Sequence, residues 1–115
     1  MLAMRLFILL PLLLAVPVTA ARFVATAYST RGVTASGCRV KKGIIAVDKR
    51  IIPLGSRVLV KGIGWCAALD TGRNIKGRRI DLFLSSRGAC RRFGVQRVTV
   101  TKIVRPRRGK HTCKH

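Results

Sequence analysis

Acidic side chains are almost absent from this sequence of 115 residues, which holds three aspartates and no glutamate against 24 lysines and arginines. The formal net charge is therefore +21 at pH 7. A surface of this charge repels copies of itself and attracts polyanions. The basic residues are spread along the chain, with the densest cluster in residues 105–110, which favours general electrostatic attraction over an element that reads bases.

Aromatic residues are also scarce, at 5% of the chain, and most lie within apolar strand patterns. They do not form a platform for stacking bases, so we do not expect specific binding of nucleic acid. A Cys-x-x-Cys pair is missing as well. Cys113 lies close to His111 and His115, which leaves a zinc site as an alternative, but histidines in a polar tail are usually solvated. We therefore predict no metal and no cofactor.

Long apolar runs are confined to the N terminus, where an apolar stretch at residues 6–17 precedes small residues at 18–21. The stretch is shorter than the about 20 residues of a membrane span, and Pro11 and Pro17 interrupt it. We predict a signal peptide over residues 1–21, cleaved at or one residue before its end, with no transmembrane span afterwards. The alternative is an uncleaved anchor. In both cases the domain is exported to the periplasm, the cell envelope or the extracellular space.

The rest of the chain has the length of one compact domain, too short for two. Because a core of this size is marginal, we expect the four cysteines of an exported protein to supply one or two disulfides. The sequence does not choose among the three pairings, and one alternative is a single bridge with a peripheral Cys113. The tail, residues 105–115, has no apolar period and is expected to be basic and flexible. The cysteines are Cys38, Cys66, Cys90 and Cys113.

Short apolar segments separated by glycine-rich turns predict a small β-barrel rather than a helical bundle. One short helix is expected, with Ser85 or Ser86 as its N-cap, Phe93 near its end and Gly94 at its C-terminal side. The expected strands are residues 23–29, 44–47, 57–60, 65–69, 79–83 and 96–104.

Each of the three aspartates stands beside apolar strand residues. Asp48 follows Ile-Ile-Ala-Val, Asp70 follows Ala-Ala-Leu, and Asp81 is flanked by Ile80 and Leu82. A carboxylate in such surroundings must be paired, hydrogen-bonded or protonated. Each aspartate is therefore either a structural acceptor of turn N–H groups or a functional group.

Several short strings follow one another in order along the chain, and together they resemble the three-aspartate (3D) domain. This domain is shared by lytic transglycosylases of the membrane-bound A type and by the stationary-phase-survival muralytic proteins of bacteria. The resemblance covers residues 23–104 and implies an all-β fold over residues 22–104, a small six-stranded double-psi β-barrel with one short helix, whose crossing loops frame a cleft. The strings are Ala25-Thr-Ala-Tyr-Ser29, Thr34-x-Ser36-Gly37, Gly43-Ile-Ile-Ala-Val-Asp48, Ile52-Pro-Leu-Gly-Ser56, Ala68-Leu-Asp-Thr-Gly72, Ile75-Lys-Gly77 and Arg79-Ile-Asp-Leu-Phe83.

The resemblance also implies residue roles. Asp81 matches the family's proposed general acid, Asp70 lies close to it in the family's cleft, and Asp48 completes the catalytic set. Four further residues match nearby motif positions and are expected to contact sugars or to orient the carboxylates: Thr26, Tyr28, Thr71 and Lys76. The alternative for Tyr28 is a partly buried barrel aromatic, and the alternative for Lys76 is a solvated cation. The chain departs from the family at Arg73 and Asn74, which make the loop bulkier and more cationic.

The implied activity is that of an exported peptidoglycan lytic transglycosylase, which cleaves the β-1,4 bond between N-acetylmuramic acid and N-acetylglucosamine and leaves a 1,6-anhydro product. The general acid must begin protonated, although surrounding cations lower the pKa of a carboxyl. Burial of Asp81 and repulsion from Asp70 would raise that pKa again. The alternatives are a non-catalytic module that binds peptidoglycan or other anionic envelope polymers, and a secreted cationic protein in which the barrel is only a scaffold.

Overall fold

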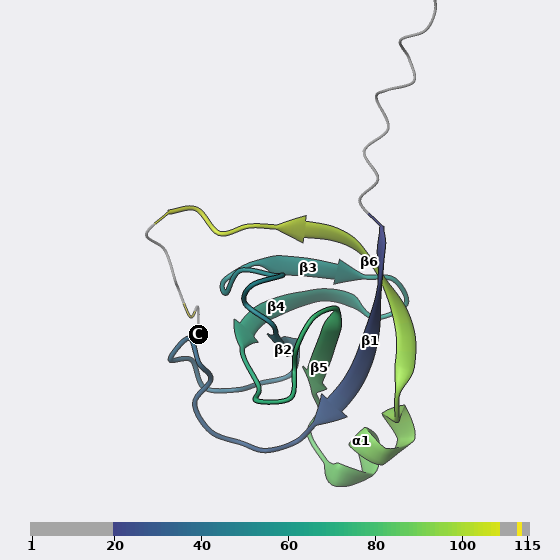
Figure 1. Ribbon diagram of the computed structural model, residues 1–115. Coiled ribbons are helices and arrows are strands. Elements are labelled where there is room, and N and C mark those ends of the chain that lie inside the picture. Colours follow the sequence, from purple (N-terminus) through teal and green to yellow (C-terminus); the bar gives the residue numbers. More distant parts are fainter. Residues whose placement is uncertain (1–19, 109–112, 114–115) are drawn as a thin grey trace, which may run out of the picture.

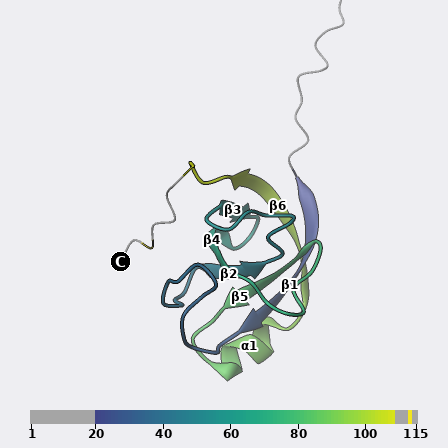
Figure 2. The same ribbon diagram turned by 60° about the vertical axis from the view of Figure 1, so that its left-hand side comes forward.

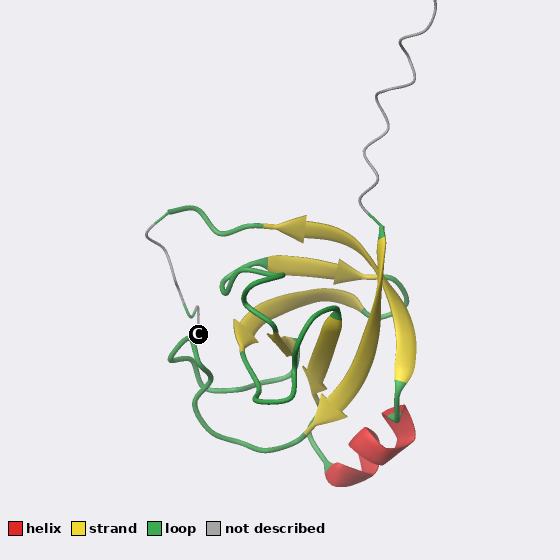
Figure 3. Ribbon diagram, in the orientation of Figure 1, coloured by secondary structure: helices red, strands yellow, loops and turns green. Residues whose placement is uncertain are grey.

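Six strands close into one barrel in the order β1-β5-β2-β4-β3-β6. The computed structural model describes residues 20–108 and Cys113, so the predicted signal peptide lies outside the described residues. Figure 1 shows the strands wrapped around a common core, and Figure 3 separates them from the loops by colour. The elements are β1 (Ala21–Tyr28), β2 (Ile44–Val47), β3 (Arg57–Val60), β4 (Gly64–Asp70), β5 (Arg79–Phe83), α1 (Arg87–Phe93) and β6 (Gln96–Val104).

The strand directions are mixed. β1 pairs with β5 and β2 pairs with β4 in parallel, whereas the other four pairs of the ring are antiparallel. The loop from β1 to β2, visible again in the turned view of Figure 2, joins two strands that are not neighbours in the ring, because β5 lies between them. The closed, six-stranded barrel with one helix confirms the predicted fold class. Four of the six strands have the predicted bounds, and β1 and β4 differ by at most two residues at an end.

Side chains that point inward from alternate positions of each strand fill the barrel interior. On β2, Ile45 and Val47 point inward and are fully buried, and on β5 Ile80 and Leu82 also point inward and are buried. The outward residues of these two strands are not all solvated. Ile44 and Phe83 form a second apolar cluster with Val40 of the loop before β2. This explains why every residue of β2 is buried and why its sequence is continuously apolar.

The single described helix, α1, follows β5 and leads into β6. Its N-cap is Ser86, whose hydroxyl accepts a hydrogen bond of 3.1 Å from the Ala89 N–H, as the sequence predicts. Gly94 ends the helix with φ of 63°, a conformation that favours glycine, and its N–H donates to the Cys90 carbonyl. Phe93 packs the helix onto the barrel core. Within residues 20–108, no helix is long and apolar enough to cross a membrane.

Candidate active site

Asp81 stands on the outer face of β5, because its neighbours Ile80 and Leu82 point into the core. Its register partner on β1 is Thr26. The Thr26 hydroxyl donates a hydrogen bond of 2.9 Å to Asp81 Oδ1. Two residues brought together by parallel pairing thus form the first contact of the site.

Asp70 ends β4 and accepts three hydrogen bonds. The Tyr28 hydroxyl donates to its Oδ2 at 2.9 Å, and the N–H groups of Ala35 and Thr71 donate to its Oδ1 at 3.0 and 2.9 Å. Hydrogen bonds to a charged acceptor are stronger than neutral ones, so these donors hold the orientation of the carboxylate firmly. The Tyr28 ring also meets Phe83 edge to face, with 5.6 Å between ring centroids.

Strand β2 separates the two carboxyl groups. Ala46 is the register partner of Asp70 on one side and of Asp81 on the other, so all three residues form one row across the barrel wall. A register shift between Ile45 and Ala46 places Asp70, rather than Leu69, in this row. Since neighbouring strands lie about 4.8 Å apart, the Cα atoms of the two aspartates are roughly 10 Å apart. The middle residue of this row, Ala46, has a single methyl group as its side chain.

Burial raises the pKa of Asp81 above the ordinary aspartate value, and the negative charge of Asp70 adds a smaller rise. The Thr26 hydrogen bond and the nearby Arg79 guanidinium act in the opposite direction without cancelling the effect of burial. This agrees with the expectation that burial and Asp70 oppose the cationic surroundings. Arg79 Nε is buried and has no hydrogen-bond partner among the described residues.

The same surroundings also shift the pKa of Tyr28. Burial, the hydrogen bond to Asp70 and the charges of Asp70 and Asp81 all raise the pKa of its phenol, so the hydroxyl stays a donor. The two expectations for Tyr28 are therefore compatible: it is a partly buried aromatic of the barrel, and it orients a candidate catalytic carboxylate.

Asp48 has a different environment just beyond β2. Arg50 donates to both of its oxygens, from Nε at 3.0 Å and from Nη2 at 2.8 Å. The N–H groups of Arg50 and Gly77 donate at 3.0 and 2.9 Å. These contacts, first of all the Arg50 side chain, hold the pKa of Asp48 well below its usual range. No hydrogen bond joins Asp48 to Asp70 or Asp81 in the part of the chain that the structure describes.

The remaining predicted site residues, Thr71 and Lys76, line a pocket together with Asp48 and not with Asp81. This pocket has a volume of about 470 Å³ and lies between the segment after β2 and the loop after β4. Arg73, the departure from the family pattern, lines it too. The pocket is strongly cationic. Its lining includes the one carboxylate of Asp48, which is paired with Arg50, and four basic residues, Lys49, Arg50, Arg73 and Lys76.

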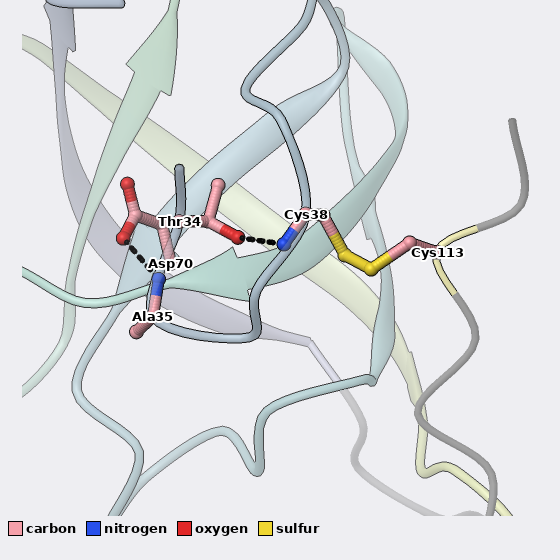
Figure 4. Close-up of a disulfide and its surroundings, with 5 residues drawn as sticks. All are labelled: Thr34, Ala35, Cys38, Asp70 and Cys113. Carbon is pink, nitrogen blue, oxygen red and sulfur yellow. Dashed lines mark hydrogen bonds between the residues drawn. A yellow bond between two sulfur atoms is a disulfide. The ribbon is translucent and has the colours of Figure 1, made fainter. Parts of the chain in front are cut away.

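Residues 34–38 fold back onto Asp70 and are tied to the tail (Figure 4). The Ala35 N–H reaches Asp70, and the Thr34 hydroxyl accepts a hydrogen bond of 3.1 Å from the Cys38 N–H. Cys38 forms a disulfide with Cys113, 75 residues later in the sequence. The alternative in which Cys113 is peripheral is therefore wrong, because this residue is bonded to the segment that contacts Asp70.

The other cysteines are free thiols. Cys66 is buried inside the barrel and Cys90 lies on α1, so the structure forms one disulfide from the four cysteines. Cys113 is engaged in that bond, and His111 and His115 lie outside the described residues. Within the described part of the chain, no group of His, Cys, Asp and Glu side chains has the arrangement of a metal site.

Two contributors to the site carried no recognisable signal in the sequence. Ala46 matters because it is small and lies between two aspartates, and Ala35 matters through its backbone N–H. Neither property depends on a chemically distinctive side chain. The string that contains Ala35 did mark the segment, although not the contact.

Comparisons with known proteins show the family and the fold of this chain. The sequence model of the 3D domain matches residues 43–104. The cell wall-binding protein YocH of Bacillus subtilis is 44% identical over 87 residues, which cover 72% of this chain and 30% of YocH. The putative cell wall shaping protein YabE of the same organism is 38% identical over 87 residues, covering 72% of this chain and 21% of YabE. The chain thus spans less than a third of the length of these relatives.

Among solved structures, MltA from E. coli resembles the chain with a TM-score of 0.55 and 24% sequence identity. The match covers 65% of this chain and 28% of MltA. At this identity the likeness concerns the fold alone.

Proposed function

Since the chain belongs to the 3D domain family, we propose that its barrel is a peptidoglycan lytic transglycosylase in which Asp81 is the general acid and base. The observation that carries the proposal is the environment of Asp81. This carboxyl is partly buried on the outer wall of the barrel, its pKa is raised, and a second carboxylate stands on the other side of β2. A raised pKa is what a general acid needs in order to begin the reaction protonated.

The reaction requires one proton donor that later becomes an acceptor. Asp81 gives its proton to the glycosidic oxygen as the bond from C1 of N-acetylmuramic acid breaks. The 6-hydroxyl of the same sugar then forms a bond to C1, and the Asp81 carboxylate takes the hydroxyl proton. The products are a 1,6-anhydro sugar and a free N-acetylglucosamine hydroxyl. Because the nucleophile belongs to the substrate, a second catalytic carboxylate is not needed, unlike in ordinary glycosidases.

The other predicted site residues take supporting roles in this proposal. Asp70 disfavours ionisation of Asp81 through its charge, Tyr28 holds Asp70, and Thr26 orients Asp81. Thr71 donates its N–H to Asp70, and Lys76 would contact an acidic group of the substrate from the neighbouring pocket. Asp48, whose two oxygens are occupied by Arg50 and Gly77, serves as a structural clamp between two loops.

Digestion of purified sacculi tests the proposal. The mature domain is incubated with sacculi, and 1,6-anhydromuropeptides are measured by mass spectrometry for the wild type and for Asp81→Asn. We expect a loss of at least about a hundredfold in the variant, the usual scale for removal of a general acid. Circular dichroism confirms that both proteins are folded. Equal product from both proteins would exclude Asp81 as the proton donor.

A second candidate is a non-catalytic module that binds peptidoglycan or another anionic polymer of the envelope. The name of YocH, a cell wall-binding protein, favours it, as does the net charge of +21. However, the matched region is 30% of YocH, so wall binding by that protein can reside elsewhere in its chain. Wall binding without product, equal in Asp81→Asn and abolished by salt, would favour the module over the enzyme. Both candidates place the protein in the cell envelope or outside the cell.

A further inference from the structure

The single tryptophan of the chain, Trp65, is exposed on the outer face of the barrel. It lies near the start of β4, and 45% of the residue is accessible to solvent. The Arg57 guanidinium from β3 lies over its ring, 4.6 Å from the centroid. A lone exposed aromatic residue needs no functional explanation. What distinguishes Trp65 is the hollow beside it.

This hollow has a volume of about 500 Å³, within the range of small-molecule sites, and we call it the Trp65 hollow. Gly43, Gly55 and Ala67 line it without any side chain longer than a methyl group. The wall is formed by Lys41, Lys42, Ile44, Arg57, Trp65 and Leu69.

The backbone beneath the hollow is firmly held. The Ala67 N–H donates to the Gly43 carbonyl at 2.8 Å, and the Gly55 N–H donates to the Ala68 carbonyl at 2.9 Å. Ala67 is also the register partner of both Ile44 on β2 and Arg57 on β3. The floor of the hollow is therefore part of the barrel wall, and Lys41, Lys42, Gly43 and Gly55 come from the turns that precede β2 and β3.

Its chemistry combines a flat apolar ring with cations. An indole ring packs against the C–H face of a sugar ring, while guanidinium and ammonium groups bind carboxylates. A glycan that carries acidic substituents presents both features. Asp70 ends the same strand, five residues after Trp65, which corresponds to roughly 16 Å along β4. A sugar on Trp65 would thus lie more than one ring away from the bond near Asp81.

We propose that the Trp65 hollow is a distal subsite for peptidoglycan, in which a hexosamine ring stacks on Trp65 and Arg57 and Lys42 bind an acidic group of the peptide stem. The proposal rests on the proposed function, because it gives the same glycan a second contact on the same outer wall. Trp65, Arg57 and Lys42 would select for a glycan with acidic substituents, and none of these three residues belongs to the aspartates or to the family strings.

Because Trp65 is the only tryptophan, its intrinsic fluorescence reports on the hollow without a label. The titration uses Asp81→Asn, which prevents turnover, and soluble tetrasaccharides of N-acetylglucosamine and N-acetylmuramic acid with peptide stems. We expect a saturable change in emission, and binding several-fold tighter than that of neutral chitotetraose. Addition of salt should reduce this difference, because it screens the cations. An unchanged emission would overturn the proposal.

Calorimetric titration then separates the hollow from general attraction. Trp65→Ala should bind the tetrasaccharide at least about tenfold more weakly, whereas Val95→Ala, which truncates another exposed apolar residue, should bind as before. Arg57→Gln should weaken binding more than Arg97→Gln, an equal change of charge at an exposed position of β6. The assignment would be overturned if Trp65→Ala and Val95→Ala changed the affinity equally and Arg57→Gln and Arg97→Gln did so too. It would also be overturned if a single-stranded oligonucleotide changed the Trp65 emission as much as the tetrasaccharide does.

The two proposals fail separately. If sacculus digestion depends on Asp81 but Trp65→Ala binds and digests like the wild type, the distal subsite is wrong and the enzyme stands. If the tetrasaccharide binds at Trp65 but sacculi yield no anhydro product, the subsite stands and belongs to a wall-binding module.

Discussion

Asp48 and Asp81 are the same side chain in opposite surroundings, although Asp48 directly follows β2 and Asp81 lies on β5, the neighbour of β2 in the barrel. Asp48 receives a guanidinium and two backbone N–H groups, which lower its pKa. Asp81 receives one hydroxyl, and burial raises its pKa despite a nearby arginine. In a chain with 24 basic residues, both carboxyls have cations nearby. Asp48 is itself buried, so the lowering of its pKa follows from its direct donors rather than from overall charge.

The largest expected effect is a difference in thermal stability between the variants Asp48→Asn and Asp81→Asn. At neutral pH, Asp48→Asn should lower Tm by on the order of 10 °C, because the Arg50 pair loses its charge and the Gly77 contact is weakened. Asp81→Asn should leave Tm unchanged or raise it by a few degrees, since it removes a poorly solvated carboxyl. Thermal melts of the two matched variants test this contrast. Equal effects would remove the distinction between a structural and a functional aspartate.

The pH dependence of stability should have opposite signs at the two positions. The pKa of an unfolded aspartate is about 3.9. The pKa of Asp48 is lowered in the folded state, so its stabilisation is present above that value and is lost as the pH falls through the folded pKa. The pKa of Asp81 is raised, so its contribution is complete below that value and is lost as the pH rises through the folded pKa.

Melts of the wild type and both Asn variants from about pH 2 to pH 8 measure these signs. The Tm deficit of Asp48→Asn should shrink in acid, and any Tm gain of Asp81→Asn should appear only at the higher pH values. A deficit of Asp48→Asn that stays constant down to pH 2 would contradict the lowered pKa.

Thr26→Val sharpens the comparison at Asp81 by removing its hydroxyl donor. That hydrogen bond lowers the pKa, so its loss should raise the pKa of Asp81 further. For a general acid, the alkaline limb of the pH–rate profile should then move to higher pH, with the plateau rate within about tenfold of the wild type. Thr101→Val, which removes a hydroxyl bonded to a carbonyl on β3, is the matched control and should leave the limb in place. A limb that moves to lower pH would show that another group titrates.

Tyr28→Phe should have the smallest effect. It removes one of three donors to Asp70 and keeps the ring that contacts Phe83, so we expect a cost of about 1 kcal/mol in the free energy of unfolding. The alkaline limb should move less than in Thr26→Val, because Tyr28 donates to Asp70 and not to Asp81. Chemical denaturation and the pH–rate profile test the two parts. A larger shift than that of Thr26→Val would make Asp70 the titrating group.

Much of the fold followed from local patterns. The apolar run Ile44–Val47 and the alternating segment Gln96–Val104 were predicted with their observed bounds, and Ser86 and Gly94 delimit the helix as expected. These features depend on neighbouring residues only, which is why they can be read from the chain. The pairing of β1 with β5 is different, because it joins residues 55 positions apart, such as Thr26 and Asp81. The resemblance to the 3D domain implied a closed barrel but did not name this pairing, which came from the structure.

The sequence by itself determined which side chains are available: three aspartates beside apolar strands, one tryptophan, four cysteines and a large excess of positive charge. Tertiary structure decided how they are used. A register shift in the β2–β4 pair put Asp70 in the row of Asp81, with Ala46 between them, and a distant Cys113 was joined to Cys38. The physical reason is that burial, strand register and charge distances depend on the closed barrel as a whole, whereas composition and periodicity are local properties.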